Sequence, residues 1–140
     1  ITEWKLQTDG VKYESALGRN ASSVPGPFPR WKHYAALDWE HATWGIRLAQ
    51  TFQSGYEDTN IFPVRVPAPL PRSVSSYEVW DLQARYTGWR NTKLVVGVRN
   101  LFDRDPPFTN QPFSYQVGYD PNYADPRGRT FYASVTYTFK

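Results

Sequence analysis

Cysteine and methionine are both absent from this chain of 140 residues. Without cysteine, the chain can form neither a disulfide scaffold nor a thiolate metal site. Without methionine, it lacks a start residue of its own, so we expect it to be part of a longer protein. The sequence also has no run of eighteen or more apolar residues, which excludes a transmembrane helix, and no signal segment begins at Ile1.

A strong excess of charge of one sign is also missing. Sixteen basic and thirteen acidic residues give a formal net charge of +3, and the basic residues are scattered along the chain. Proteins that bind nucleic acid concentrate their basic residues in a patch or stripe. The sequence therefore predicts no nucleic-acid partner. Aromatic residues, in contrast, make up 17% of the chain, so its apolar content lies largely in Trp, Tyr and Phe.

Proline is missing from long stretches of the chain. All twelve prolines fall within three clusters, from Pro25 to Pro29, from Pro63 to Pro71 and from Pro106 to Pro126. Because proline cannot donate a hydrogen bond to a strand ladder, the clusters indicate loops and the stretches between them indicate paired β-structure.

Apolar and polar residues alternate with a period of two in the stretches without proline, as in strands that have one apolar face. The pattern predicts five strands, over residues 31–40, 44–53, 80–86, 93–99 and 131–139. A tight turn around His41 and Ala42 makes the first two a hairpin. We expect a sixth strand within Ile1 to Leu17, where Asp9-Gly10 interrupts the pattern. The predicted fold class is all-β and antiparallel.

Charged residues separate by face. In the middle of the predicted strands, every charge lies opposite the apolar side chains, and these residues are Lys32, Asp38, Arg47, Asp81, Arg85, Lys93 and Arg99. We expect all of them except Lys32 to pair across neighbouring strands, with a direct role in guiding substrate as the alternative. Only Glu78 and Arg129 share the apolar parity, and both lie at strand ends.

Two architectures explain such alternation. In a soluble β-sandwich the apolar face would be turned into a core, as in a secreted module that binds carbohydrate through exposed aromatic residues. In an outer-membrane β-barrel it would face lipid. Three features favour the barrel: aromatic residues at strand ends, small polar residues on the opposite face, and connections that alternate between short and roughly twenty residues. Because membrane barrels begin at eight strands, further strands must complete this one.

Two segments carry a resemblance to a known family. They are Gly97-Val98-Arg99-Asn100-Leu101-Phe102-Asp103-Arg104-Asp105-Pro106-Pro107 and the final stretch from Asp125-Pro126-Arg127-Gly128-Arg129 to Lys140. This pair resembles the C-terminal end of TonB-dependent outer-membrane receptors. The stretches Pro27 to His33 and Ser54 to Asp58 are similar to that family as well, so the resemblance extends from about Pro25 onward.

The resemblance implies an antiparallel, up-and-down transmembrane β-barrel of 22 strands, of which residues 1–140 are the last five or six. The plug domain and the earlier strands would lie upstream. Such receptors are transporters of the Gram-negative outer membrane that import a ferric siderophore, haem, cobalamin or a glycan. The implied partners are the rest of the receptor, the TonB complex, the barrel-assembly machinery and outer-membrane lipid.

Candidate site residues follow from these expectations. Aromatic and polar residues of the external loops offer stacking and hydrogen bonds to a small-molecule or glycan substrate, namely Phe62, Arg65, Tyr115, Tyr119, Asn122 and Tyr123. Alternatively, they only pack their loops. The outward residues of the last strand resemble the signal read by the assembly machinery, or only anchor the strand in lipid: Phe131, Ala133, Val135, Tyr137 and Phe139.

Catalytic and metal chemistry find no support in the sequence. His33 and His41 belong to no metal or nucleophile motif, and we expect both at a surface or interface. The spacing of the loop aspartates matches no calcium loop. We therefore predict no catalytic residue, no metal and no cofactor. Asn100 is expected to cap the loop entry through Asx-type hydrogen bonds, with ligand contact as the alternative.

Overall fold

The computed structural model describes residues 5–7, 13–15, 17–20, 26–58, 72–109 and 118–139. Within these ranges every regular element is a β-strand, which confirms the all-β prediction. The same ranges contain no helix of the length and apolar character needed to cross a membrane. The chain divides into two compact units: unit 1 is Ile1–Lys32, Gln53–Tyr77 and Pro106–Pro126, and unit 2 is His33–Phe52, Glu78–Asp105 and Arg127–Lys140.

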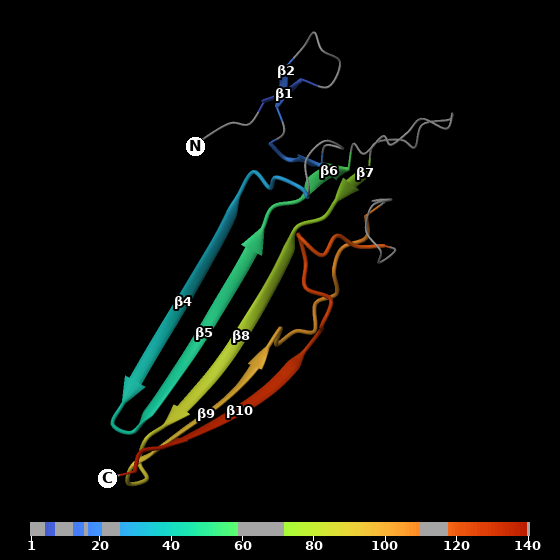
Figure 1. Cartoon of the computed structure of the whole chain (residues 1–140). Helices are drawn as coiled ribbons and strands as arrows, with labels where there is room; N and C mark the ends of the chain where they lie inside the picture. Colours follow the sequence, from blue (N-terminus) through green and yellow to red (C-terminus); the bar gives the residue numbers. More distant parts are fainter. Residues whose placement is uncertain are drawn as a thin grey trace. The chain divides into compact units, whose positions relative to one another are not determined.

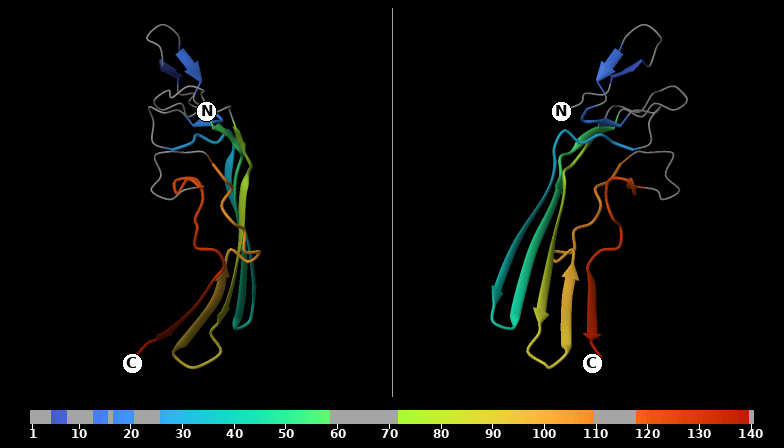
Figure 2. Two further views of the ribbon diagram at one scale, coloured as in Figure 1. Left: turned by 90° about the vertical axis from the view of Figure 1, so that its right-hand side faces the viewer. Right: turned by 60° about the vertical axis from the view of Figure 1, so that its left-hand side comes forward.

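Unit 2 is built on one five-stranded sheet with the strand order β10-β9-β8-β5-β4 (Figure 1). Its strands are β4 (Lys32–His41), β5 (Trp44–Gln53), β8 (Tyr77–Tyr86), β9 (Thr92–Arg99) and β10 (Thr130–Tyr137). All five strands predicted from the alternation are therefore confirmed. The sheet is a twisted single layer (Figure 2), and the described residues form no closed barrel.

Short turns join the hairpins at one end of this sheet. Only Ala42 and Thr43 separate β4 from β5, and Ala42 adopts a φ of 49°. Between β8 and β9, the amide of Thr92 donates to the carbonyl oxygen of Trp89 at 3.1 Å, and Asn91 has a φ of 57°. Asparagine tolerates this left-handed conformation better than most residues, which fits its place in the turn.

The strand register places the alternating residues on two faces. Leu82 lies opposite Val98, which in turn lies opposite Phe131, and the same row-by-row match continues toward the turn end of the sheet. The polar parity aligns in the same way, with Gln83, Gly97 and Tyr132 in one row. We call these two sides of the sheet the apolar face and the polar face. The predicted separation of residues by face is thus realised in the ladder.

Unit 1 contains short strands that the sequence did not predict. A three-stranded sheet has the order β3-β6-β7, formed by β3 (Arg19–Asn20), β6 (Tyr56–Asp58) and β7 (Arg72–Val74). Its β3–β6 pair is parallel, which departs from the expected wholly antiparallel pattern. Strands β6 and β7 pair with each other on either side of the proline cluster from Pro63 to Pro71. Each has only three residues, which is too short for an alternation of apolar and polar residues to indicate it.

The sixth strand expected within Ile1 to Leu17 is instead a pair of three-residue strands, β1 (Lys5–Gln7) and β2 (Tyr13–Ser15), which run antiparallel to each other. The prediction of one further strand was wrong because the Asp9-Gly10 dipeptide lies between two short paired segments. Asp-Gly is a frequent hairpin signal.

Candidate functional site

The apolar face of the main sheet is exposed along most of its length. Leu82 is 36% exposed, Val96 43% and Val135 66%. The soluble β-sandwich alternative requires this face to be buried in a core. Within the described residues no such core covers this face. Leu82, Val96 and Val135 are therefore open to solvent or to another molecule.

Aromatic residues gather on the apolar face near the turn end of the sheet. The rings of Trp44 and Tyr86 lie 4.7 Å apart between centroids, and Trp89 meets Tyr86 edge to face at 5.5 Å. Trp39 stacks with His41 at 5.9 Å. Rings with an apolar body and one polar atom favour a boundary between an apolar and an aqueous phase. The predicted position of these aromatic residues at strand ends is confirmed.

A few polar side chains lie on the apolar face at the end of the sheet away from the short turns, and they form hydrogen bonds there. Glu78 accepts a hydrogen bond from the indole nitrogen of Trp80 at 2.6 Å. His33 joins Gln50 through a 3.1 Å hydrogen bond and stacks on Phe52 with 5.2 Å between ring centroids. These polar groups are therefore hydrogen-bonded where they lie.

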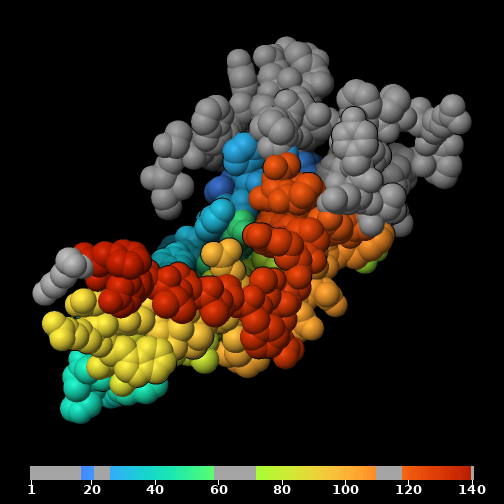
Figure 3. Space-filling model, turned by 60° about the horizontal axis from the view of Figure 1, so that its bottom comes forward, coloured from blue at the N-terminus to red at the C-terminus, as the bar shows by residue number. Residues whose placement is uncertain are grey.

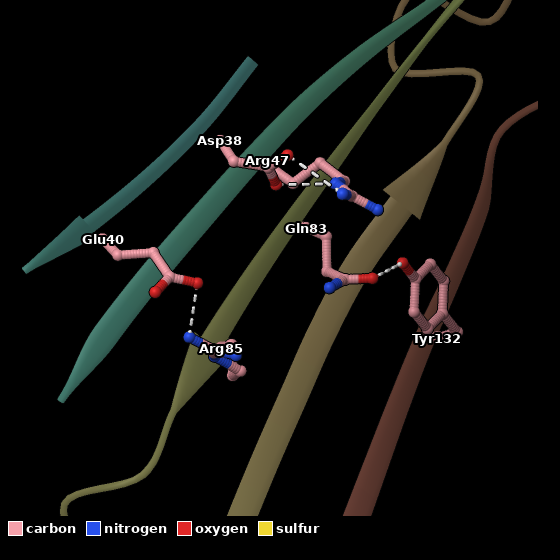
Figure 4. Close-up of polar contacts among 6 residues, drawn as sticks. All are labelled: Asp38, Glu40, Arg47, Gln83, Arg85 and Tyr132. Carbon is pink, nitrogen blue, oxygen red and sulfur yellow. Dashed lines mark hydrogen bonds and ion pairs between the residues drawn. The ribbon is translucent and has the colours of Figure 1, made fainter. Parts of the chain in front are cut away.

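The polar face holds the charge network that the sequence predicts (Figure 4). Arg47 of β5 binds Asp38 of β4 through two hydrogen bonds, Nε to Oδ1 at 2.7 Å and Nη2 to Oδ2 at 2.9 Å. Arg85 of β8 binds Glu40 of β4 at 2.7 Å, although β5 lies between them. Pairing between neighbouring strands is thus confirmed for Asp38 and Arg47, whereas Arg85 reaches past its neighbour.

Three further charges of the polar face make other contacts. Asp81 accepts a hydrogen bond from the amide of Asn100 at 2.9 Å. The Arg99 guanidinium lies over the ring of Tyr132, 5.6 Å from its centroid. Lys93 lies opposite Thr136 in the ladder, so it faces a hydroxyl-bearing residue in the β9–β10 register. Among the described contacts, an ion pair between neighbouring strands is therefore present for Asp38 and Arg47 and not for Asp81, Lys93 or Arg99.

Asn100 organises the loop that follows β9. Its side-chain oxygen accepts from the amide of Arg104 at 2.8 Å, and its side-chain nitrogen donates to the carbonyl oxygen of Arg104 at 2.9 Å. Asp103 then accepts from the amide of Arg129 at 2.7 Å, which ties this loop to the start of β10. The expected capping role of Asn100 is confirmed.

A cluster of tyrosines organises unit 1. Tyr123 is only 3% exposed, and its hydroxyl lies 3.1–3.2 Å from the carbonyl oxygens of Gln53, Ser54 and Ser75. Gln53 returns a hydrogen bond to the carbonyl oxygen of Tyr123 at 2.8 Å. Tyr56 packs edge to face against Tyr123 at 4.9 Å. Burial raises the pKa of Tyr123 to about 12 and also raises the pKa of Tyr56.

The structure separates the predicted ligand residues. Tyr123 is buried in the tyrosine cluster, Tyr119 is half-buried, and Asn122 is exposed. Asn122 is placed by its own amide, which donates to the Asp120 side chain at 2.8 Å. Phe62, Arg65 and Tyr115 lie outside the described residues. Tyr123 thus follows the alternative of loop packing, although its partners, carbonyl groups 48 to 70 positions away, could not be named from the sequence.

The five residues of the predicted assembly signal lie together at one edge of the sheet. Strand β10, whose atoms are red in Figure 3, has β9 on one side and no described strand on the other in the order of the sheet (Figure 1). Phe131 is 72% exposed, and Phe139, just beyond the strand, is 87% exposed. Phe131, Ala133 and Val135 share the apolar face with Tyr137, whose ring contacts Phe139 at 4.9 Å.

Potential metal-ligand side chains are dispersed in the part of the chain that the structure describes. Among those residues, no three His, Cys, Asp or Glu side chains are placed to hold a metal ion. No family model, no curated protein and no solved structure matches this chain.

Proposed function

We propose that this chain is the C-terminal part of the wall of a bacterial outer-membrane β-barrel receptor, which imports a scarce nutrient with energy from the TonB complex. The observation that carries the proposal is the two-faced single-layer sheet. One face exposes Leu82, Val96 and Val135, and the other carries the Asp38–Arg47 pair. Lipid against the first face would cover its apolar side chains, and water against the second would solvate its charged side chains.

Strand length supports this environment. The five strands of the main sheet have eight to ten residues each. A tilted strand of about nine to eleven residues crosses the hydrocarbon layer of a membrane. The aromatic residues near the turn end, Trp39, Trp44 and Tyr86, would lie at one boundary of that layer, and the bonded polar groups of His33 and Glu78 would lie at the other.

The two edge strands support a larger assembly. In the described residues β4 and β10 each have a neighbour on one side only. Unpaired backbone groups in lipid cost several kcal/mol each, so strands that span a membrane must close into a barrel. The remainder of a 22-stranded receptor barrel would supply the missing neighbours, and its first strand would pair with β10.

The receptor class is supported by the resemblance of the two terminal segments. Asn100 and Asp103 lie within that motif, and both bind backbone amides that shape the connection from β9 to β10. The substrate would be a ferric siderophore, haem, cobalamin or glycan. Asn122 and Tyr119 in the loop before β10 are the described candidates for contact with it.

Membrane fractionation tests the proposal. The chain, produced with its native upstream sequence in a Gram-negative host, should sediment with the outer membrane and require detergent for extraction. It should also migrate faster on a gel before heating than after it, as folded barrels do. A chain that stays soluble and monomeric without detergent would overturn the proposal, because the apolar face would then be covered by protein.

A further inference from the structure

Two polar-face contacts skip a strand, and both cross a glycine. Tyr132 of β10 bonds Gln83 of β8 at 3.0 Å, and the residue between them in the register is Gly97 of β9. Arg85 of β8 bonds Glu40 of β4 at 2.7 Å, and its guanidinium lies against Gly45 of the intervening β5. Figure 4 shows both contacts on the same face.

A side chain larger than that of glycine would be crowded in both places, more severely at Gly97. A Cβ added to Gly97 would overlap the ring carbons and the hydroxyl of Tyr132. A Cβ added to Gly45 would lie 3.3 Å from both Nε and Nη2 of Arg85, closer than is usual for a Cβ. Neither glycine has a positive φ, so backbone conformation does not explain them. An interior glycine in a strand often marks such a close approach.

The geometry gives these contacts a mechanical effect. Neighbouring strands lie about 4.8 Å apart, so second neighbours lie about 9.6 Å apart in a flat sheet. A side chain that lies flat over a glycine and bonds the next strand resists any motion that separates the two outer strands on this face. Bending toward the apolar face is such a motion, because it opens the polar face.

We propose that the Tyr132–Gln83 and Arg85–Glu40 contacts are two clamps that hold the polar face concave. Together they span all five strands, since one joins β8 to β10 and the other joins β4 to β8. Closure of a sheet into a barrel requires curvature that designed barrels obtain from glycines at defined positions. The inference that the clamps contribute to barrel closure rests on the proposed function. The inference that they hold the polar face concave rests only on contacts within this sheet.

A double-mutant cycle tests each clamp. Alanine has a better strand propensity than glycine, so Gly97→Ala should be harmless unless the Tyr132 ring occupies its space. When Tyr132 is present, we expect Gly97→Ala to raise the unfolding equilibrium constant by about fivefold or more, because the added methyl group overpacks the site. When Gly97→Ala is combined with Tyr132→Val, we expect no such increase. Gly45→Ala should likewise raise the unfolding equilibrium constant when Arg85 is present, and it should have no such effect in a chain that carries Arg85→Ala. The chain is produced with its native upstream sequence, refolded in detergent micelles and unfolded with urea.

Equal effects of glycine replacement in both backgrounds would overturn the clamps. If Tyr132→Val does not fold, the cycle of Gly45 with Arg85 decides. Curvature is read separately by spin labels on cysteines placed at Ala36 of β4 and Ser134 of β10, since the chain has no cysteine of its own. The mean distance between the labels should lengthen in the Gly45→Ala, Gly97→Ala double variant, and an unchanged distance would contradict the inference. A chain that folds without detergent would contradict only the proposed membrane function.

Discussion

The side-chain amide of Asn100 binds both backbone groups of Arg104, accepting from its amide and donating to its carbonyl oxygen. Asn100 is buried and has a φ of 52°, a conformation that asparagine tolerates better than most residues. Asn100 thus follows β9, turns the chain through its positive φ and supplies hydrogen-bond partners to the backbone of the loop that follows. This explains why an asparagine directly follows the last residue of β9.

Replacement of Asn100 by glycine should isolate the contribution of this amide. Glycine accepts the positive φ, so the variant loses only the two side-chain hydrogen bonds and leaves the Arg104 groups without them. We expect a loss of about 1–3 kcal/mol in the free energy of unfolding, measured by urea denaturation in detergent. Asp105→Asn, at an exposed position of the same loop, serves as the control and should change stability little. A neutral Asn100→Gly variant would contradict the capping role.

Tyr123→Phe should weaken unit 1 without removing its packing. The phenylalanine ring would still pack against Tyr56. The carbonyl oxygens of Gln53, Ser54 and Ser75 would lose their shared hydrogen-bond donor, the Tyr123 hydroxyl. We expect a loss of about 1–2 kcal/mol. Limited proteolysis of the chain should then cut earlier near the loop that carries Tyr123. Asn122→Ala, at the exposed neighbouring position, should leave the cleavage rate unchanged.

The same tyrosine predicts a dependence on alkaline pH. Burial raises the pKa of Tyr123 to about 12, above the value of about 10 for an exposed tyrosine. Because the folded state holds this proton more tightly, the stabilisation is complete below pH 10 and is lost as the pH rises toward 12. The stability difference between the unaltered chain and Tyr123→Phe should therefore shrink across that window. A constant difference would show that Tyr123 ionises equally in both states.

The sequence predicts the main sheet well because one physical rule governs it. Apolar and polar side chains separate onto opposite faces of the sheet, so alternation along one strand already indicates the facing of residues such as Leu82 and Asp81. A shared face restricts the register to shifts of two residues, and the structure places Leu82, Val98 and Phe131 in one row. Local turn chemistry, as at Asn100, was predictable for the same reason.

The rest depends on contacts between distant positions. Strands β3, β6 and β7 have only two or three residues, too few to show a period. Tyr123 looks like any loop tyrosine until its carbonyl partners are known. The strand-skipping contacts could have been suspected, because Gly45 and Gly97 interrupt otherwise regular strands, but their partners required the register.

Phe139 should matter for assembly and not for the stability of the sheet. It is 87% exposed, and among described residues its ring contact is with Tyr137. We expect Phe139→Ser to leave the urea midpoint of the refolded chain unchanged while it lowers the amount of folded protein in the outer membrane. Heat-modifiable migration of membrane fractions measures the second quantity. A fall in both quantities together would mean that the ring only anchors the strand.

Arginine substitutions should report which face meets lipid. Leu82→Arg and Val135→Arg place a charge on the apolar face, where an arginine near the middle of a bilayer costs about 2–4 kcal/mol. Thr136→Arg is the matched control, because it lies next to Val135 on β10 and points to the polar face. We expect the first two variants to be lost from the outer membrane and the third to accumulate nearly normally, as measured by immunoblots of membrane fractions. Equal losses at Val135 and Thr136 would contradict the facing of β10 and, with it, the contact of this sheet with lipid.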